Sequence, residues 1–340
     1  MIPASADLLP LQEVVARALG RVEERFERQL ISELPPVQQL VEHVERYHGK
    51  MIRPVLAVLA GLATDRAAME PTDVHVRDGH IVVAAVCEMV HLATLVHDDV
   101  LDEADTRRKS DTVNKLYGNE AAVILGDLLF SAAYHLCAQL EDQATSLAIA
   151  EVGMTLCAGE LLQLHHRENF SLDEATYYEI VRRKTASLIA VACRLGASHA
   201  GATPETAARF QAFGLDLGVA FQIQDDLLDL TGDQRVVGKS LGKDAEKGKL
   251  TLPMIHHLTQ AGPAVRGETL RLLGEAGHPG QVASGPMLVA ALSATASIEY
   301  ARRTAQRFVD QAKAAIAPMH ESPAKRLLLQ MADAVITRAY

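Results

Sequence analysis

Apolar residues recur at intervals of three and four along almost the whole sequence, and this periodicity restricts the fold more than any other feature. It is clear in residues 11–26, 177–196 and 324–339, whereas strand-like alternation is rare. A period near 3.6 puts apolar side chains on one helix face, so we predict an all-α fold. Boundary signals support this prediction: Gly49 follows one helical run, Ser171 to Glu174 precede another, Gly196 closes that helix, and Thr203-Pro204-Glu205 opens the next.

Two segments, residues 81–99 and 120–140, are apolar nearly all round rather than on one face. A helix of that kind is normally surrounded by other helices, so we expect both at the centre of a bundle. Neither a domain linker nor a repeat is visible, and we predict one helical domain over residues 1–340. Loops are expected at residues 64–79, 231–249 and 276–286.

The composition limits the kinds of molecule that the protein is expected to bind. The 340 residues are 49% hydrophobic, enough for a large core, and the 33 basic and 43 acidic residues give a net charge of −10. No run of Lys and Arg is long enough to follow a nucleic acid backbone, so nucleic acid is not an expected partner. A negative net charge still permits a small anionic ligand, provided that basic residues cluster locally around it and that metal ions supply the remaining positive charge.

Two further observations concern the cellular compartment. The first thirty residues lack the pattern of an export signal, and the longest uncharged stretch, residues 276–298, is broken by Gly and Pro, so we expect no transmembrane segment. The four cysteines show no CxxC spacing, and we expect buried thiols in a cytoplasmic protein. They are Cys87, Cys137, Cys157 and Cys193.

Two acidic motifs with identical spacing stand 127 residues apart, each after a long apolar run. The first is Asp98, Asp99 and Asp102, and the second is Asp225, Asp226 and Asp229. In each motif the first and last carboxylates share a helix face, where like charges repel. A single such motif is more often a solvated helix end, but two copies favour metal sites. Ligand sets made only of oxygen favour Mg²⁺.

Cationic residues stand near both motifs, and they suggest two diphosphate sites, one bridged by metal ions and one held directly by Arg and Lys. Each cation alone is more often an ordinary surface residue. His91 lies two turns before Asp98, where a core role and a ligand-binding role are about equally expected, and His97 is expected to be structural. The cations are Lys50, Arg53, Arg107, Arg108, Lys184, Lys239, Lys243, Lys247 and Lys249.

Several common catalytic motifs are missing from the sequence. It contains no GxxxxGK[ST] loop, no GxGxxG after a strand, no GxSxG elbow and no convincing Cys/His nucleophile pair. Chemistry would therefore have to rest on metal ions and a diphosphate.

With these motifs in order, the chain resembles the trans-isoprenyl (polyprenyl) diphosphate synthase family, as a medium- or long-chain member. The resemblance is strong over residues 45–260, through GKMIRP, HDDVLD with RR, GNEAAVILGD, GELLQL, KT, FQIQDD and GKSLGKDAEKGKLTLP. It implies an isoprenoid-synthase-type bundle of about ten or more helices around a central cavity. It also implies a homodimer.

The resemblance implies a role for each matching residue. Asp98, Asp102 and Asp225 would ligate Mg²⁺, three ions per active site when diphosphate is bound, with Asp99, Asp226 and Asp229 in support. The allylic diphosphate would meet Arg107, Lys184, Lys239 and Lys249, and isopentenyl diphosphate would meet Gly49, Lys50, Arg53, His91 and Arg108. Thr185, Gln222 and Gln163 would line the forming carbocation.

The implied reaction is ionisation of the allylic diphosphate, condensation with isopentenyl diphosphate, and elimination of a proton to the released diphosphate. Four residues would set product length: Ala93 and Thr94, which are small, and Phe130 and Tyr134 on the neighbouring helix. We expect an all-trans product longer than geranylgeranyl (C20). The alternatives are a geranylgeranyl or farnesyl diphosphate synthase, a class I terpene cyclase, and a non-catalytic synthase subunit.

Overall fold

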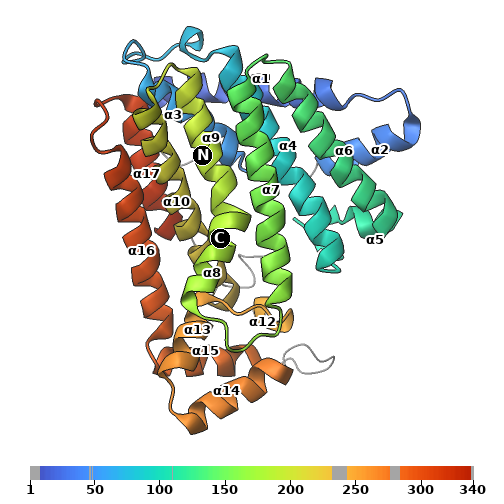
Figure 1. Ribbon diagram of the computed structural model, residues 1–340, viewed down its shortest axis with the longest axis vertical. Helices are drawn as coiled ribbons and strands as arrows, with labels where there is room; N and C mark the ends of the chain where they lie inside the picture. Colours follow the sequence, from blue (N-terminus) through green and yellow to red (C-terminus); the bar gives the residue numbers. More distant parts are fainter. Residues whose placement is uncertain are drawn as a thin grey trace. The chain divides into compact units, whose positions relative to one another are not determined.

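The computed structural model describes residues 8–45, 47, 49–108, 110–231, 243–275 and 284–337, and this part of the chain is almost entirely helical (Figure 1), which confirms the all-α prediction. The α-helices are α1 (Leu9–Leu30), α2 (Pro35–Glu45), α3 (Ile52–Thr64), α4 (Asp78–Leu101), α5 (Val113–Tyr117), α6 (Asn119–Ala138), α7 (Gln143–His165), α8 (Glu174–Val181), α9 (Ser187–His199), α10 (Pro204–Thr231), α12 (Lys243–Glu246), α13 (Leu252–Gln260), α14 (Pro263–Glu275), α15 (Ser284–Ala294), α16 (Ser297–Ile316) and α17 (Pro323–Thr337).

Short elements of other types accompany these helices. A 3₁₀ turn, η2 (Asp73–His75), lies within the predicted loop 64–79, and a π-helical turn, η3 (Arg182–Ala186), separates α8 from α9. The strands β1 (Thr106–Arg107) and β2 (Ser110–Asp111) pair antiparallel just after the first acidic motif. They are too short for their alternation to be visible in the sequence.

The predicted helix boundaries are mostly correct. Asp173 is the N-cap of α8, where its side chain accepts a 2.7 Å hydrogen bond from the Thr176 N–H, and α10 begins at Pro204. The prediction that Gly196 ends a helix is wrong, because α9 continues to His199. A Cβ at Gly196 would collide with the backbone of Ala57 on α3. Glycine is required there for close helix packing rather than for a cap.

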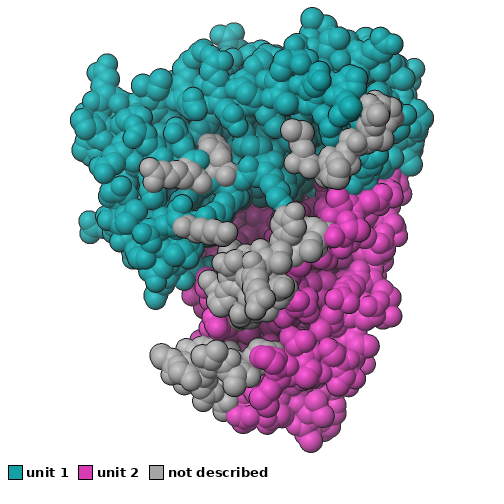
Figure 2. Space-filling model, turned by 180° about the vertical axis from the view of Figure 1, so that it is seen from behind, with its two compact units in different colours: residues 1–154, 188–214, 315–331 teal, residues 155–187, 215–314, 332–340 magenta. Residues whose placement is uncertain are grey.

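The chain groups into two compact units, coloured separately in Figure 2. Unit 1 comprises residues 1–154, 188–214 and 315–331, and unit 2 comprises residues 155–187, 215–314 and 332–340. The single domain over residues 1–340 stays a prediction.

Unit 1 is built around α4, which packs against α1, α3 and α6. Its residues are buried from His80 to Val90, as expected for a helix that is apolar all round. Helix α1 is attached to this core by arginines one helical turn apart. Arg17 pairs with Asp73, Arg21 donates to the Val76 carbonyl, and Arg25 pairs with Asp78.

Two expectations about burial are wrong. The segment of α6 was expected to be enclosed, but Val123, Ile124 and Tyr134 on that helix are exposed. One side of α6 packs on α4, and the other is left to solvent in the single chain. Cys157 is also exposed, whereas the other three cysteines are buried.

Three helices in the described structure are long and apolar enough to cross a membrane by length and composition alone. They are α4, α6 and α7, and the most apolar windows of these helices are 78%, 44% and 33% buried inside the protein. The prediction of no transmembrane segment rested on residues 276–298 alone and did not take these three helices into account. For α4, burial by other helices accounts for the apolar composition; for α6 and α7 it accounts for less than half.

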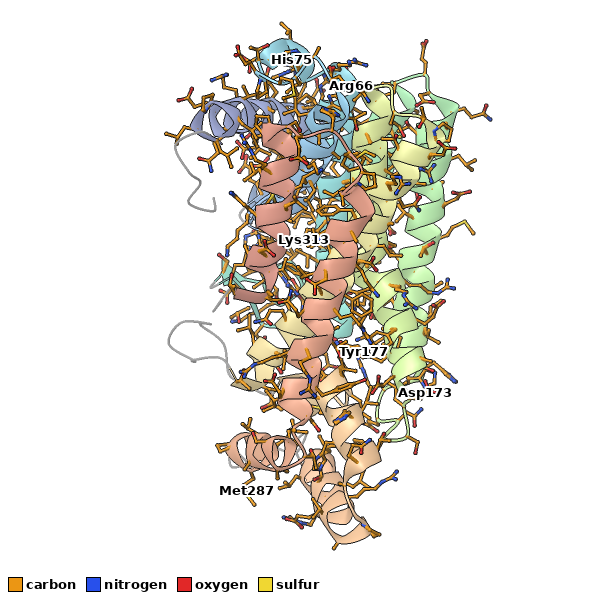
Figure 3. All side chains as sticks on the ribbon, turned by 90° about the vertical axis from the view of Figure 1, so that its left-hand side faces the viewer. Arg66, His75, Asp173, Tyr177, Met287 and Lys313 are labelled. Carbon is orange, nitrogen blue, oxygen red and sulfur yellow. The ribbon has the colours of Figure 1, made fainter. Side chains whose placement is uncertain are left out.

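Unit 2 contains α8, η3 and α12 to α15, together with parts of longer helices. The ring of His256 on α13 stacks on Tyr300 of α16, with centroids 4.0 Å apart, and the Tyr300 hydroxyl donates to Glu174 at the start of α8. Lys313, labelled in Figure 3, pairs with Asp333 on α17 at 2.7 Å. These contacts join α8 to the C-terminal helices.

Candidate active site

The first acidic motif occupies the end of α4. Asp98 and Asp99 lie in its last turn, and Asp102 is the C-cap residue, whose N–H donates to the Asp98 carbonyl at 2.8 Å. Because the C-terminal end of a helix carries partial negative charge, three carboxylates there need nearby positive charge. Asp98 and Asp102 are half-buried, whereas Asp99 is only 1% exposed.

Arg107 on β1 supplies positive charge to this motif. Its Nε and Nη2 lie 2.8 and 2.6 Å from the same oxygen of Asp99. Burial lowers the pKa of Arg107, but the hydrogen bond and charge of Asp99 outweigh it, so the pKa lies above its ordinary value. The structure therefore places Arg107, predicted to hold the allylic diphosphate, in an ion pair with an aspartate of the motif.

The second acidic motif lies near the end of α10, in unit 2. Asp225 and Asp229 are half-buried and Asp226 is 4% exposed. One oxygen of Asp226 accepts a 2.6 Å hydrogen bond from the Tyr177 hydroxyl, and the other accepts a 2.8 Å hydrogen bond from Gln222 Nε2. Burial, and then the charge of Asp244, raise the pKa of Asp226 well above its ordinary value, against the lowering effect of the two hydrogen bonds.

Asp229 is connected to the segment that follows. Its Oδ2 accepts a 3.1 Å hydrogen bond from the N–H of Asp244 in α12. The Lys249 N–H then donates to the Asp244 carbonyl at 2.8 Å, and the N–H of Glu168 donates to the Gly248 carbonyl at 2.9 Å. Gly248 has a φ of 65°, which glycine adopts at low cost. These backbone contacts fix the position of Lys249; Lys239 lies outside the described residues.

Lys184 and Thr185 lie on the π-helical turn η3, a type of turn that is often found at functional sites. Lys184 forms an ion pair with Glu160 of α7. The Thr185 hydroxyl donates to Gln222 Oε1 at 2.9 Å, so Gln222 joins Thr185 to Asp226. The structure thus brings together Thr185, Gln222 and Asp226, which were all predicted as site residues.

Two glycines allow η3 to pack closely against its neighbours in unit 2. A Cβ at Gly159 of α7 would lie 2.8 Å from the Lys184 nitrogen, and one at Gly218 of α10 would lie 2.5 Å from Ala186 Cα. Gln163, also on α7, is half-buried.

The residues predicted to bind isopentenyl diphosphate lie in unit 1. The guanidinium of Arg108 lies directly against Gly49, where any Cβ would collide with it, and donates to the Tyr47 carbonyl. The Tyr47 hydroxyl accepts a 3.0 Å hydrogen bond from the N–H of Val113, the first residue of α5. The loop before α3 and the hairpin β1–β2 are therefore joined, as the prediction requires for Gly49 and Arg108.

The other predicted members of this group lie on nearby elements of unit 1. Lys50 is exposed in the loop, Arg53 is half-buried in the first turn of α3, and His91 is half-buried on α4. Burial lowers the pKa of Arg108, and the negative charge of Glu88 opposes this effect. Glu88 is buried one helical turn before His91.

The residues proposed to set product length are distributed as follows. Ala93 is fully buried on α4, and the Thr94 hydroxyl donates to the His91 carbonyl of the same helix at 2.7 Å. The Phe130 ring lies 6.2 Å from the His97 ring, and the Tyr134 hydroxyl lies against Gly153 of α7. Their role in product length stays a prediction.

Sequence reasoning missed four side chains at these sites: Tyr47, Glu88, Glu160 and Tyr177. Glu88 could have been found, because a carboxylate within the apolar run 81–99 has to be paired. Glu160 lies in the quoted motif GELLQL, where only the family resemblance marks it. Tyr47 and Tyr177 form hydrogen bonds with segments distant in the sequence, so no local sequence pattern marks them.

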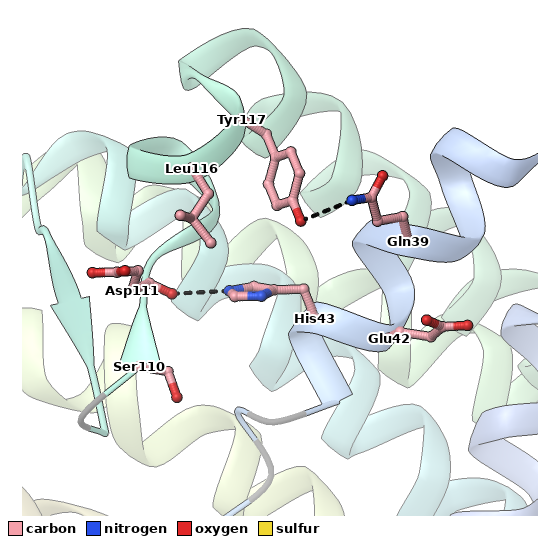
Figure 4. A pocket seen from close by; sticks show the side chains of 7 residues that line it. All are labelled: Gln39, Glu42, His43, Ser110, Asp111, Leu116 and Tyr117. Atoms are coloured by element: carbon pink, nitrogen blue, oxygen red, sulfur yellow. Dashed lines mark hydrogen bonds between the residues drawn. The ribbon is translucent and has the colours of Figure 1, made fainter.

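A pocket of about 570 Å³ lies elsewhere in unit 1, between α2 and the segment from β2 to α5 (Figure 4). In it, His43 Nε2 lies 2.9 Å from the Asp111 carbonyl oxygen and Gln39 donates to the Tyr117 hydroxyl. None of the predicted site residues lines it. Its lining residues are Gln39, Glu42, His43, Ser110, Asp111, Leu116 and Tyr117.

No group of three or more His, Cys, Asp or Glu side chains in the described part of the chain is arranged as a metal site. The donor set fits a hard divalent cation nevertheless, because each acidic motif offers only carboxylate oxygens. In each motif the buried aspartate, Asp99 or Asp226, is held by protein donors, and the half-buried aspartates flank it.

Comparison with known proteins is consistent with this site. The sequence model of the polyprenyl synthetase family matches residues 35–284. Octaprenyl diphosphate synthase of Escherichia coli is 32% identical over 332 residues, which cover 98% of this chain and 99% of the relative. Heptaprenyl diphosphate synthase component 2 of Geobacillus stearothermophilus is 34% identical over 322 residues, covering 95% and 96%.

A solved structure is similar over the whole chain. The polyprenyl synthase from Caulobacter crescentus, complexed with calcium and isoprenyl diphosphate, has a TM-score of 0.88 at 28% identity, covering 99% of this chain and 100% of its own. The family match over residues 35–284 includes both acidic motifs and every Lys and Arg predicted to bind a diphosphate.

Proposed function

This chain belongs to the polyprenyl synthetase family, and from that premise we propose which of its residues perform the reaction. It is a medium- to long-chain trans-polyprenyl diphosphate synthase, a prenyltransferase that joins isopentenyl diphosphate to an allylic diphosphate. The observation that carries this function is that the matched segment, residues 35–284, keeps both acidic motifs and the cationic loops intact.

Asp98, Asp102 and Asp225 hold Mg²⁺ in this proposal, with three ions when diphosphate is bound. These carboxylates are half-buried and offer oxygen alone, which suits Mg²⁺. Asp99 and Asp226 support them from buried positions, and Asp229 supports them while it anchors α12. Bound Mg²⁺ supplies Lewis-acid stabilisation of the departing diphosphate.

The cationic side chains bind and orient the two substrates. The allylic diphosphate is held by Arg107, Lys184, Lys239 and Lys249. These cations place positive charge where negative charge develops as the carbon–oxygen bond to the diphosphate breaks. Lys184 exchanges Glu160 for the diphosphate when substrate binds. Gly49, Lys50, Arg53, His91 and Arg108 hold isopentenyl diphosphate.

Neutral polar groups face the carbocation. The Thr185 proton is directed to Gln222, so the lone pairs of the Thr185 oxygen remain to stabilise positive charge on the allylic group. The proton lost at the end of the reaction passes to the released diphosphate. The product is longer than geranylgeranyl (C20), because Ala93 and Thr94 are small and leave room for the growing tail.

The protein acts as a homodimer in the cytoplasm in this proposal. Exposed apolar side chains on α6 and α7 support the homodimer, because a second copy would cover surface that is otherwise costly to leave in water.

The direct test is incubation of the purified protein with Mg²⁺, isopentenyl diphosphate and farnesyl diphosphate, followed by sizing of the dephosphorylated products. We expect products longer than C20.

Asp98→Ala and Asp225→Ala should each abolish turnover while the protein keeps its fold, as measured by circular dichroism. Asp310→Ala, at an exposed position on α16, is the control. Loss of activity no greater than in the control would refute the metal assignment, and absence of any elongated product from the unaltered protein would refute the function.

A further inference from the structure

We propose that Tyr177 is a positioning residue for the reaction: its hydroxyl holds Asp226 and thereby fixes the second acidic motif relative to Lys184 and Thr185. This inference rests on the proposed function and adds a residue to it. Tyr177 lies on α8 (Figure 3), is buried, and is 49 residues distant from Asp226 in the sequence.

The hydrogen bonds around Asp226 have a fixed direction. Thr185 donates to the carbonyl oxygen of Gln222, and the amide nitrogen of Gln222 donates to Oδ1 of Asp226. Tyr177 donates to Oδ2 of Asp226 at 2.6 Å. A carboxylate whose two oxygens are both held cannot rotate about its Cβ–Cγ bond without breaking a hydrogen bond in a buried setting.

Two of these contacts join the same pair of segments. Helix α8 continues directly into η3, so Tyr177 and Thr185 belong to one stretch of chain, and Gln222 and Asp226 lie one turn apart on α10. The first contact is Tyr177–Asp226, and the second is Thr185–Gln222. Together they set both the spacing and the rotation of η3, with Lys184, relative to Asp225.

Removal of the Tyr177 hydroxyl would leave only the second contact. The ring of a phenylalanine would still fill the buried space, so the helices would keep their packing. Asp226 would gain rotational freedom, and the diphosphate-binding Lys184 and the metal-binding Asp225 would be less well aligned. Because misalignment of reacting groups acts on the chemical step, it lowers kcat more than it raises KM.

The adjacent residue provides a matched control. Tyr178 is also on α8, and its hydroxyl is buried without a hydrogen-bond partner in the described structure. Tyr177→Phe and Tyr178→Phe remove the same atom from neighbouring positions. Only the first removes a hydrogen bond to Asp226.

The experiment compares the two variants with the unaltered protein. We expect Tyr177→Phe to lower kcat by about tenfold, as loss of one buried hydrogen bond implies, with KM for isopentenyl diphosphate within about twofold. Tyr178→Phe should match the unaltered protein. A second readout needs no turnover: the rise in Tm on addition of Mg²⁺ and inorganic pyrophosphate should be smaller in Tyr177→Phe than in Tyr178→Phe.

A double-mutant cycle tests whether Tyr177 acts through Asp226. In an Asp226→Asn background, Tyr177→Phe should cause little further loss of kcat, because the interaction is already altered. Equal kcat and equal Tm response for the two tyrosine variants would overturn the proposal, as would loss of the fold in Tyr177→Phe, which would make the hydroxyl a purely structural group. The proposed function itself fails in a different way, namely if the unaltered protein forms no elongated product.

Discussion

At the scale of single residues, Gly49 shows how a missing side chain can serve a binding site. The guanidinium of Arg108 occupies the space that any Cβ at position 49 would need. Because a guanidinium is the far end of a flexible chain, the fold can accommodate a methyl group there by moving Arg108. A substitution at Gly49 should therefore weaken substrate binding while leaving the stability of the fold nearly unchanged.

Gly49→Ala should raise KM for isopentenyl diphosphate by at least about tenfold, the effect of weakening one charge-assisted phosphate contact. The KM for the allylic substrate and the Tm should change little. Steady-state kinetics with each substrate varied in turn, with differential scanning fluorimetry, measure these quantities. A fall in Tm with unchanged KM would show that Gly49 serves the backbone instead.

His80 is a second residue whose chemistry can be tested. It is fully buried near the start of α4, and its Nδ1 accepts a 3.0 Å hydrogen bond from the Arg77 N–H, which requires the neutral ring. Burial, followed by the charges of His199 and Arg77, lowers the pKa of His80 from 6.5 to about 4.

The unfolded chain therefore binds more protons than the native protein between these two values, and His80 favours folding above pH 6.5 and loses this contribution as the pH falls towards 4. The contribution is of order 3 kcal/mol at most, at about 1.4 kcal/mol per pKa unit. Urea unfolding across this range should show falling stability in the unaltered protein and a flatter profile in His80→Gln. His135→Gln, at an exposed position on α6, should keep the steep profile. Equal profiles in all three proteins would contradict the assignment.

At the scale of elements, the turn η3 sets the orientation of the two-residue motif Lys184-Thr185. The hydrogen bonds of a π-turn span one more residue than those of an α-helix, which changes the direction of Lys184 and Thr185 relative to α8. The turn packs against Gly159 of α7 and Gly218 of α10. Small residues at both positions let the three segments approach closely.

Gly218→Ala should force α10 away from η3, because the added methyl would meet backbone atoms of Ala186 that cannot move aside. We expect a loss of about 1–3 kcal/mol in the free energy of unfolding, together with a fall in kcat. Gly20→Ala is the control. A Cβ at Gly20 in α1 meets nothing within 4 Å, and the change should stabilise the protein by about 0.5–1 kcal/mol. Chemical denaturation measures both, and a neutral Gly218→Ala would argue against tight packing of the turn.

At the scale of the whole molecule, the exposed apolar side chains of α6 and α7 suggest a protein partner. Ile124 on α6 is 66% exposed, and Met154 on α7 is 75% exposed. Leu147, which is also exposed, lies seven residues before Met154 and so on nearly the same helix face. Side chains of this size in such numbers usually mark an interface.

If a second copy covers this surface, the unaltered protein should elute at twice the 36.7 kDa of one chain, and Ile124→Asp with Met154→Asp should elute as a monomer. Val265→Asp, at a similarly exposed position on α14, should leave the dimer intact. Size-exclusion chromatography with light scattering measures the mass. A monomeric unaltered protein, or one that sediments with lipid vesicles, would contradict the proposal.

The amino-acid sequence alone was enough to predict the helical class, the starts of α8 and α10, and the oxygen-only donor sets of the two acidic motifs. These properties depend on residues within a few positions of one another, such as the spacing from Asp98 to Asp102 or the cap at Asp173. The ordered motifs also identified the family, which the comparisons confirmed.

Which side chains contact one another became clear only from the packing of distant segments. This packing paired Asp99 with Arg107, gave Asp226 its donors Tyr177 and Gln222, assigned Gly196 to helix packing and left one side of α6 exposed. The physical reason is that periodicity reports the local backbone, whereas hydrogen bonds between α8 and α10 and close helix crossings depend on how distant segments pack. No pattern of neighbours in the chain records that Tyr177 donates and Tyr178 does not.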